Sequence, residues 1–373
     1  MKKLCFYQAI ATLVGCTIGA GVLGIPYVVS KSGFLIGLID IILIGLAVML
    51  INLYLGEVVL RTNGNHQLTG YAEIYLGKKG KLLMLLSMLI GIYGALIAYL
   101  IGVGKALSAI FGLNAFTFSL LFFVFVTFII FFGLKMMKRV ELFFSFFVIG
   151  ILVLIIIFSS FHINLDNLSD VDISNLMLPY GVILFAFLGA AAIPELKEEL
   201  NKNRRYMKKA IIVGGLIPLV LYALFAFTVI GVTGLNTSEI ATIKLGESLG
   251  KLALLFGNLF AVFAMSTSFL VLGIALKEVY MYDYKISKNI SWFLVCFVPL
   301  IIFILGVRSF ISTLGYAGAI AGGIDGVLIV LMAWKAKKIG KRKPEYKVIR
   351  GKVLGVVLML VFIVGIIYQL FVA

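Results

Sequence analysis

The sequence has little charge, cysteine or histidine. Only 13% of the 373 residues are charged and 62% are hydrophobic, against roughly 25% and 45–50% in soluble domains. Three cysteines, Cys5, Cys16 and Cys296, lie at or within apolar segments without the spacing of metal ligands. The two histidines, His66 and His162, fall in expected loops. These absences argue against a soluble domain, a zinc or iron–sulfur protein, and an enzyme with a Ser–His or metal–His site.

Long apolar runs dominate what is present. A bilayer is spanned by about 20 apolar residues in a helix, and such runs occur eleven times. The sequence therefore predicts an all-α integral membrane protein with 11 transmembrane helices in a single domain over 1–373. The first run is too long for a cleavable signal peptide and is followed by a comparable one. The expected spans are about 5–30, 33–60, 82–104, 115–134, 140–160, 177–195, 210–233, 252–276, 290–306, 309–334 and 353–372.

The net charge of +16 is unevenly distributed between the loops. If the N-terminus is cytoplasmic and the spans alternate, 27 of the 32 Lys and Arg residues fall on the cytoplasmic side. This excess is the positive-inside signal. We expect a multi-pass cell (plasma) membrane protein with a cytoplasmic N-terminus and an external C-terminus. The basic charge then orients the protein and does not indicate a nucleic-acid partner. Five basic residues remain outside: Lys31, Lys105, Lys244, Lys251 and Arg308.

Two of the spans contain glycine-rich interruptions. The first is Gly15–Tyr27, with sequence GCTIGAGVLGIPY, and the second runs from Phe185 to Pro194. Such glycines can form helix-packing faces, and Pro26 and Pro194 can be ordinary kinks. In a bilayer, however, unwound backbone is tolerated only inside protein or along a cavity. Paired interruptions in corresponding spans indicate the binding site of a transporter.

The two interruptions also divide the chain into related halves. Gly19 and Gly189 are 170 residues apart, and each opens a group of five spans. Because five is odd, the second group enters the membrane with opposite topology. We expect an inverted repeat, with helices 1–5 in 1–160, helices 6–10 in 176–335, and helix 11 appended in 351–373.

Several short motifs resemble one family of transporters. Gly19–Pro26 resembles the first-helix signature of the amino acid–polyamine–organocation superfamily, especially its amino acid/auxin permeases and bacterial aromatic amino acid permeases. Phe185-x-Phe187-x-Gly189 with Ile193-Pro194 is similar to the sixth-helix signature. Ser266–Leu270 with Gly273 resembles the eighth helix, and Gly315–Gly318 the tenth. The resemblance covers about residues 5–335 and implies the LeuT-type fold, with helices 1 and 6 broken.

Helix ends at the breaks suit a zwitterion. Free N–H groups beyond Gly21 and Gly189 can hold a carboxylate, and free carbonyls near Ile18 and Ala186 can accept from an ammonium group. Glycine at 19 and 21 would allow positive φ and close approach of a ligand. The resemblance adds Tyr99 and a phenylalanine lid, although an apolar aromatic side chain often contacts only core or lipid. The expected substrate-binding residues are Thr17, Ile18, Gly19, Ala20, Gly21, Tyr99, Phe185, Ala186, Phe187 and Gly189.

The coupling ion is expected to be Na⁺ or H⁺, with no resident cofactor and no other metal. In sodium-coupled members of the resembled fold, helix 8 supplies one carbonyl and two hydroxyls, here Ala264, Thr267 and Ser268, and helix 1 adds carbonyls, here Gly15 and Ile18. Alternatively, these hydroxyls bond back to their own helix. Asp325 is the candidate for a coupling proton because intramembrane acids are costly and usually functional; it can instead pair with a neighbouring helix.

The combined expectation is a secondary active amino acid symporter that works by alternating access. The breaks contain no Asp, Glu, Lys or Arg, which favours neutral amino acids, with large or aromatic ones among the candidates. The alternatives are a transporter-like amino acid sensor and a permease of the same fold for another small organic solute. A channel would require pore-lining rings, and the pattern of an enzyme is absent. The oligomeric state stays open.

Overall fold

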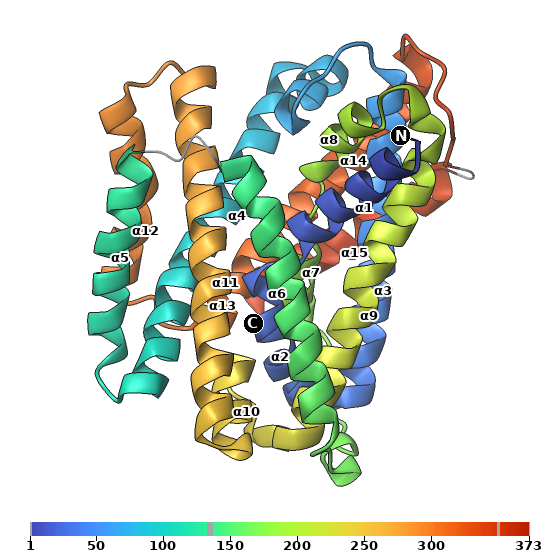
Figure 1. The fold of residues 1–373 in the computed structure, drawn as a ribbon. Coiled ribbons are helices and arrows are strands. Elements are labelled where there is room, and N and C mark those ends of the chain that lie inside the picture. The colour runs from blue at the N-terminus through green and yellow to red at the C-terminus, as the bar shows by residue number, and fades with distance from the viewer. Residues whose placement is uncertain (1, 133–136, 349–350, 373) are drawn as a thin grey trace.

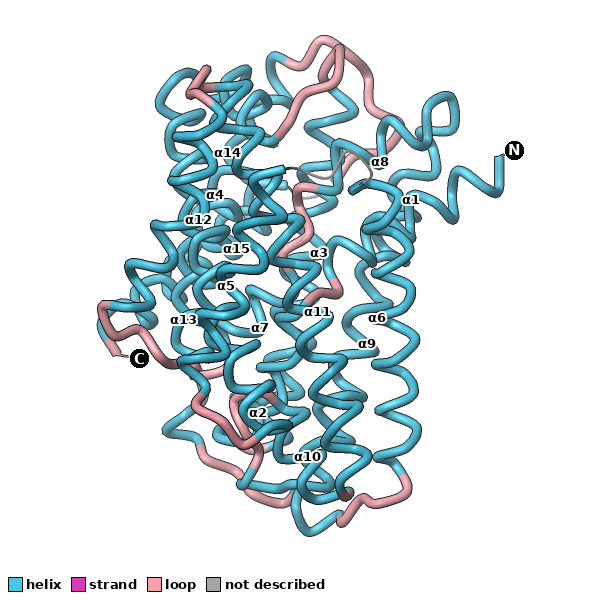
Figure 2. Tube along the Cα trace, turned by 60° about the vertical axis from the view of Figure 1, so that its left-hand side comes forward, coloured by secondary structure: helices cyan, strands magenta, loops and turns pink. Residues whose placement is uncertain are grey.

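The computed structural model describes residues 2–132, 137–348 and 351–372. In this part of the chain the fold is an all-helical bundle, with most loops at its two ends (Figures 1 and 2). The helices are α1 (Lys2–Thr17), α2 (Ile25–Ser32), α3 (Phe34–Arg61), α4 (Leu68–Phe111), α5 (Ala115–Phe132), α6 (Met137–Ser160), α7 (Tyr180–Phe187), α8 (Ala192–Leu200), α9 (Met207–Thr233), α10 (Ala241–Leu249), α11 (Lys251–Glu278), α12 (Lys288–Ile304), α13 (Phe310–Ala317), α14 (Gly323–Ile339) and α15 (Gly351–Phe371).

Short irregular helices join several of these elements. The 3₁₀ helices are η1 (Ala20–Gly24), η2 (Leu165–Leu168), η3 (Ile173–Asn175), η4 (Asn201–Tyr206) and η5 (Gly234–Asn236), and the π-helices are η6 (Val279–Asp283) and η7 (Gly318–Gly322).

The helices account for the eleven expected spans. By length and composition, eight helices of the described residues can cross a membrane, a bent pair forms a further span, and two shorter apolar helices cover 147–160 and 288–304. In chain order the spans are α1 with η1 and α2, α3, α4, α5, α6, α7 with α8, α9, α11, α12, α13 with η7 and α14, and α15. The expected all-α fold is confirmed. The division into two repeats stays a prediction.

Both expected breaks are present. α1 ends at Thr17, and the chain resumes as η1 at Ala20, with a bend of 47° in this span. α7 ends at Phe187 and α8 begins at Ala192, so this break covers 188–191, inside the interruption expected between Phe185 and Pro194. Leu188 is extended, with φ −62° and ψ 112°. Span 10 has an unexpected irregularity, because η7 inserts a π-helical turn between α13 and α14.

The broken spans lie in the middle of the bundle. α1 packs on α8 and α9, while α7 packs on α3, α13 and η7. α4 contacts α5, α11 and α13, and α14 lies between α3 and α15. Polar backbone at the breaks is thereby surrounded by protein, as an apolar environment requires.

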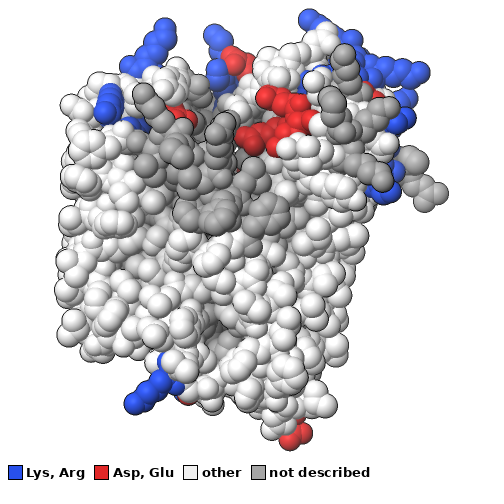
Figure 3. All heavy atoms as spheres, in the orientation of Figure 1, with Lys and Arg blue, Asp and Glu red and all other residues white. Residues whose placement is uncertain are grey.

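The charged residues mark the two ends of the bundle. On the face shown in Figure 3, Lys and Arg gather at the end of the molecule that carries the start of α1, and a broad middle band holds no charge. Large apolar side chains are exposed on several of the spans, among them Leu43 of α3, Phe125 of α5, Leu154 of α6 and Val361 of α15. An uncharged band with an apolar surface is what a lipid-facing bundle presents.

Candidate substrate and ion site at the helix breaks

Five residues of the first break lie close to the second break. Thr17, Ile18, Ala20 and Gly21 are buried, and Gly19 is partly exposed. A Cβ placed on Gly21 would lie 3.0 Å from Phe185 Cδ1 and 3.1 Å from Ala186 Cα. A Cβ on Gly189 would lie 2.5 Å from Thr17 Oγ1. The two breaks are therefore in direct contact, and glycine is needed where their backbones approach.

The conformational reason expected for two of these glycines is wrong. Gly19 is extended, with φ −126° and ψ −158°. Gly21 is not among the residues with positive φ. Close packing explains glycine at 21, because a side chain there would meet the backbone of α7. Gly19 has more room, since an added Cβ would meet Ser268 Oγ at 3.5 Å, an ordinary contact distance.

The N-terminal ends of the second half-helices have free amides. In the described part of the chain, the amides of Ala20 and Gly21 have no backbone acceptor, whereas Val22 N donates to Gly19 O at 3.4 Å. In the second break, the amides of Gly189 and Ala190 also lack a backbone acceptor. Free amides at the start of a helix, together with the positive end of its dipole, attract a carboxylate.

The carbonyl ends of the first half-helices share one partner, which the sequence analysis did not identify. Tyr222 of α9 directs its hydroxyl to Thr17 O and to Ala186 O, at 2.9 Å from each. Tyr222 is fully buried. Its ring packs on Phe187, with 5.0 Å between ring centroids. No sequence signal singles it out, since it is one of 16 tyrosines and lies in an unbroken apolar helix.

The candidate aromatic residues have different surroundings. Tyr99 of α4 is 3% exposed, and its hydroxyl is hydrogen-bonded to the Ser268 side chain. Phe185 is partly exposed and lies against Gly21 and Gly318. Phe187 is 3% exposed and packs between Tyr222 and Gly45. Only Phe185 therefore combines partial exposure with contact to the first break.

The hydroxyls expected to bind sodium are only partly directed at the break. Ser268 of α11 lies beside the first break, because its Oγ would be 3.5 Å from a Cβ built on Gly19 and its side chain interacts with Tyr99. The Thr267 hydroxyl instead donates within its own helix, with Phe263 O and Ala264 O both at 3.0 Å, the alternative named for such residues. α11 contacts η1. Ala264 is buried, Gly15 is partly exposed, and both lie within continuous helices.

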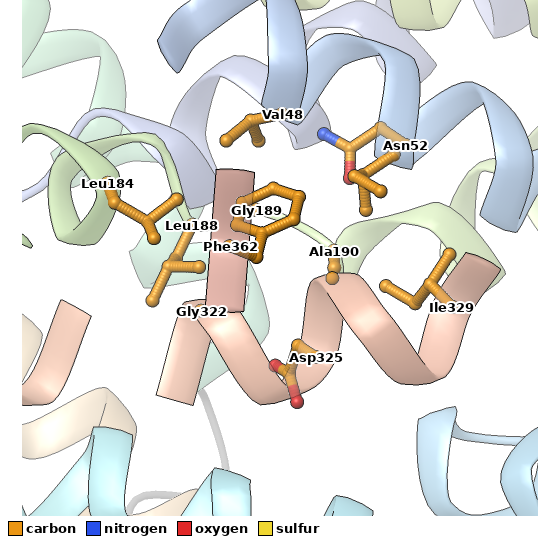
Figure 4. A pocket seen from close by; sticks show the side chains of 12 residues that line it. Val48, Asn52, Leu184, Leu188, Gly189, Ala190, Gly322, Asp325, Ile329 and Phe362 are labelled. Carbon is orange, nitrogen blue, oxygen red and sulfur yellow. The ribbon is translucent and has the colours of Figure 1, made fainter. Parts of the chain in front are cut away.

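Asp325 lies beside the second break and not with the aromatic residues. It lines a small cavity with Asn52, Leu188 and Gly189. Figure 4 shows its carboxylate directed away from Asn52. Ser87 of α4 lies near the carboxylate, but its hydroxyl donates to Ala321 O at 2.8 Å. Asp325 Oδ1 is buried without a partner in the described part of the chain. A second small cavity, lined by Thr17, Asn52 and Phe187, adjoins the first, since Asn52 lines both.

Ion pairs close both ends of the bundle around the site. At one end, Lys105 and Glu239 are 2.6 Å apart, and Glu239 also accepts from Phe310 N at 3.1 Å. At the basic end, buried Glu57 accepts from Arg61 and from Val348 N, both at 2.8 Å. Glu195 of α8 is exposed.

The comparisons with known proteins agree with this architecture. A model of the tryptophan/tyrosine permease family matches residues 2–369. The chain belongs to this family. It is therefore a membrane protein and an amino acid permease, not an enzyme.

Two relatives of this permease are known transport proteins. "Tyrosine-specific transport system 1" of Haemophilus influenzae is 28% identical over 384 residues, covering 95% of this chain and 93% of the relative. "Glutamine transporter 2" of Aliivibrio fischeri is 24% identical over 324 residues, covering 83% of each chain.

Solved structures share the fold at low identity. MhsT in complex with L-phenylalanine superposes on the permease with a TM-score of 0.65, at 15% identity and 97% coverage of both chains. A variant of the manganese transporter of Eremococcus coleocola gives a TM-score of 0.70, at 11% identity, covering 99% of the permease and 87% of that chain. The LeuT-type fold implied by the sequence resemblance is confirmed.

Proposed function

We propose that this permease is a cation-coupled symporter of neutral amino acids, with aromatic ones as its main substrates. The observation that supports it is the meeting of four helix ends at the two breaks. Free amides lie there close to two carbonyls that share the Tyr222 hydroxyl, and the breaks contain no charged side chain, an arrangement that suits a zwitterion. The tyrosine-specific relative supports an aromatic substrate. The glutamine transporter supports a neutral polar one.

In this proposal, the amides of Ala20 and Gly21 bind the substrate carboxylate. Thr17, Ile18, Gly19, Ala186 and Gly189 provide the surrounding backbone, and Tyr99 and Phe185 contact the side chain. Phe185 is the better lid of the two phenylalanines, because it is partly exposed and lies against Gly21. Phe187 would not contact the substrate; its ring packs on Tyr222 and so helps to position that residue.

The coupling ion and the orientation belong to the same proposal. Sodium would bind between Gly15 and Ile18 of α1 and Ala264, Thr267 and Ser268 of α11, once α1 and α11 close on each other. A proton would be carried by Asp325, whose Oδ1 is buried without a partner among the described residues. The basic end would face the cytoplasm. We also place the family within the amino acid–polyamine–organocation superfamily on the motifs of helices 1, 6, 8 and 10.

Uptake into proteoliposomes tests the proposal directly. Labelled L-tyrosine is offered under an imposed sodium gradient or an imposed proton gradient, with the other amino acids as competitors. We expect saturable uptake driven by one gradient and inhibited by aromatic amino acids. Inhibition by glutamine alone would move the substrate to the neutral polar class, and absence of uptake for all twenty would overturn the proposal.

Two variants assign the ion. Thr267→Ala removes one oxygen ligand, at a cost of about 1–3 kcal/mol for an unmet buried contact, and should weaken sodium activation roughly tenfold or more. Asp325→Asn removes the titratable group among the described residues that line its cavity and should uncouple uptake from the proton gradient. If both variants keep the ion dependence of the wild type, neither residue carries the coupling ion.

A further inference from the structure

Tyr222 joins the two breaks in a way that the proposed function leaves unexplained. A tyrosine hydroxyl has one proton and two acceptor lone pairs. Here it lies 2.9 Å from both Thr17 O and Ala186 O. One proton cannot fully satisfy two carbonyls, and each carbonyl oxygen has a second lone pair. Thr17 O also accepts from Gly19 N at 3.1 Å. Acceptor capacity is therefore left over on the Tyr222 oxygen and on Ala186 O, at a buried point.

The electrostatics of this point favour a cation. α1 ends at Thr17, and α7 ends one residue after Ala186. The C-terminal end of a helix carries partial negative charge from its free carbonyls. Two such ends converge on Tyr222, and no Lys or Arg lies within either break. An ammonium group carries N–H donors and a positive charge, and so suits oxygens that converge with acceptor capacity left over.

We propose that Tyr222 is a substrate-recognition residue for the α-ammonium group. Its oxygen and Ala186 O form the acceptor set for the ammonium group, and Thr17 O, which also accepts from Gly19 N, lies beside them. Without substrate, the Tyr222 proton holds both carbonyls at this point. With substrate, the same oxygen accepts from the ammonium group. This inference rests on the proposed function and adds the residue that selects for an amino group.

A chemical series of ligands separates this role from a general structural one. Binding to the purified full chain is measured for L-tyrosine, N-methyl-L-tyrosine and 3-(4-hydroxyphenyl)propionate, which lacks the amino group. We expect Tyr222→Phe to weaken L-tyrosine binding about tenfold, the worth of one charge-assisted hydrogen bond. Affinity for the propionate should not change. Wild-type protein should bind N-methyl-L-tyrosine more weakly than L-tyrosine, because methylation removes one N–H donor. This difference in affinity should be smaller in Tyr222→Phe, because the variant has already lost an acceptor for that donor.

The chain offers a matched control. Tyr180 of α7 is 4% exposed, and its hydroxyl has no partner in the described part of the structure. Tyr180→Phe therefore removes a buried hydroxyl with no role in the acceptor set, and all three affinities should equal those of the wild type. An equal loss of L-tyrosine and propionate binding in Tyr222→Phe, or no loss at all, would overturn the inference.

A ligand-side measurement covers the case in which Tyr222→Phe does not fold. N,N,N-trimethyl-L-tyrosine keeps the positive charge but has no N–H donor, so wild-type protein should bind it at least tenfold more weakly than L-tyrosine. Equal binding would overturn the inference. If the wild-type protein binds none of the twenty amino acids, both the proposed function and the role of Tyr222 are wrong. If it binds L-tyrosine and Tyr222→Phe binds it equally, only the role of Tyr222 fails.

Discussion

Gly19 and Gly21 lie two residues apart in the first break, but their surroundings differ. Gly21 packs against the backbone of α7, so an added methyl group would require α7 to move. Gly19 has only Ser268 Oγ at an ordinary contact distance. Gly19 therefore leaves space at the proposed site, and Gly21 permits two half-helices to pack.

A pair of alanine substitutions distinguishes these two roles. Gly21→Ala should lower the midpoint of thermal unfolding, since overpacking a close contact costs about 1–3 kcal/mol. Gly19→Ala should leave the midpoint within about 1 °C, because its methyl group has room, but should weaken amino acid binding by narrowing the space beside Ser268. Unfolding and equilibrium binding are measured on the same preparations. Equal unfolding midpoints for the two variants would show that the approach of Gly21 to α7 is not a tight one.

Among the elements, α3 has a central position at the basic end of the bundle. Its buried Glu57 is paired with Arg61 and accepts from Val348 N, while Lys337 of α14 lies 3.8 Å away. Tyr346 donates to Leu53 O at 2.8 Å. The segment 340–348 is thus bound across the end of α3, and Lys337 brings α14 to the same carboxylate.

Removing the charge of the Glu57 carboxylate should weaken these contacts and lower the stability of the protein. Glu57→Gln keeps an acceptor for Val348 N but leaves Arg61 without its ion partner, at a cost of about 1–3 kcal/mol. The measurement is the midpoint of thermal unfolding in detergent. Glu73 provides the control, since its ion pair with Lys81 is over 40% exposed on both side chains and should be worth less than about 1 kcal/mol. A Glu73→Gln variant that loses as much stability as Glu57→Gln would contradict this ranking.

For the molecule as a whole, the uneven charge gives a prediction about topology. With 27 of 32 basic residues on one side of the expected membrane, the start of α1 should be cytoplasmic and the end of α15 external. Alkaline phosphatase fused to the C-terminus should be active in bacteria, and green fluorescent protein fused there should be dark. The opposite pair of signals would show an inverted orientation.

The sequence by itself determined the span count and the places of the breaks. Eleven apolar runs of span length can fold only as helices in lipid, because every peptide group must be paired within its own segment. Glycine-rich interruptions in spans 1 and 6 therefore predicted the non-helical residues to within two positions. The same motifs indicated an amino acid permease, and their glycines Gly21 and Gly189 lie where the two breaks touch.

Tertiary structure decided which side chains complete the site. No distinguishing motif marks Tyr222, Asn52 or the π-turn η7, which all lie in apolar spans. Tyr222 comes to lie between the two breaks, which are far from it in sequence, only through helix packing. Phe185 and Phe187 alternate in one motif, yet one faces Gly21 and the other faces α9 and α3. The glycine-rich pattern in the sequence specifies where backbone groups lose their helical hydrogen bonds. Which hydroxyl satisfies them depends on distances across the bundle, which the pattern does not contain.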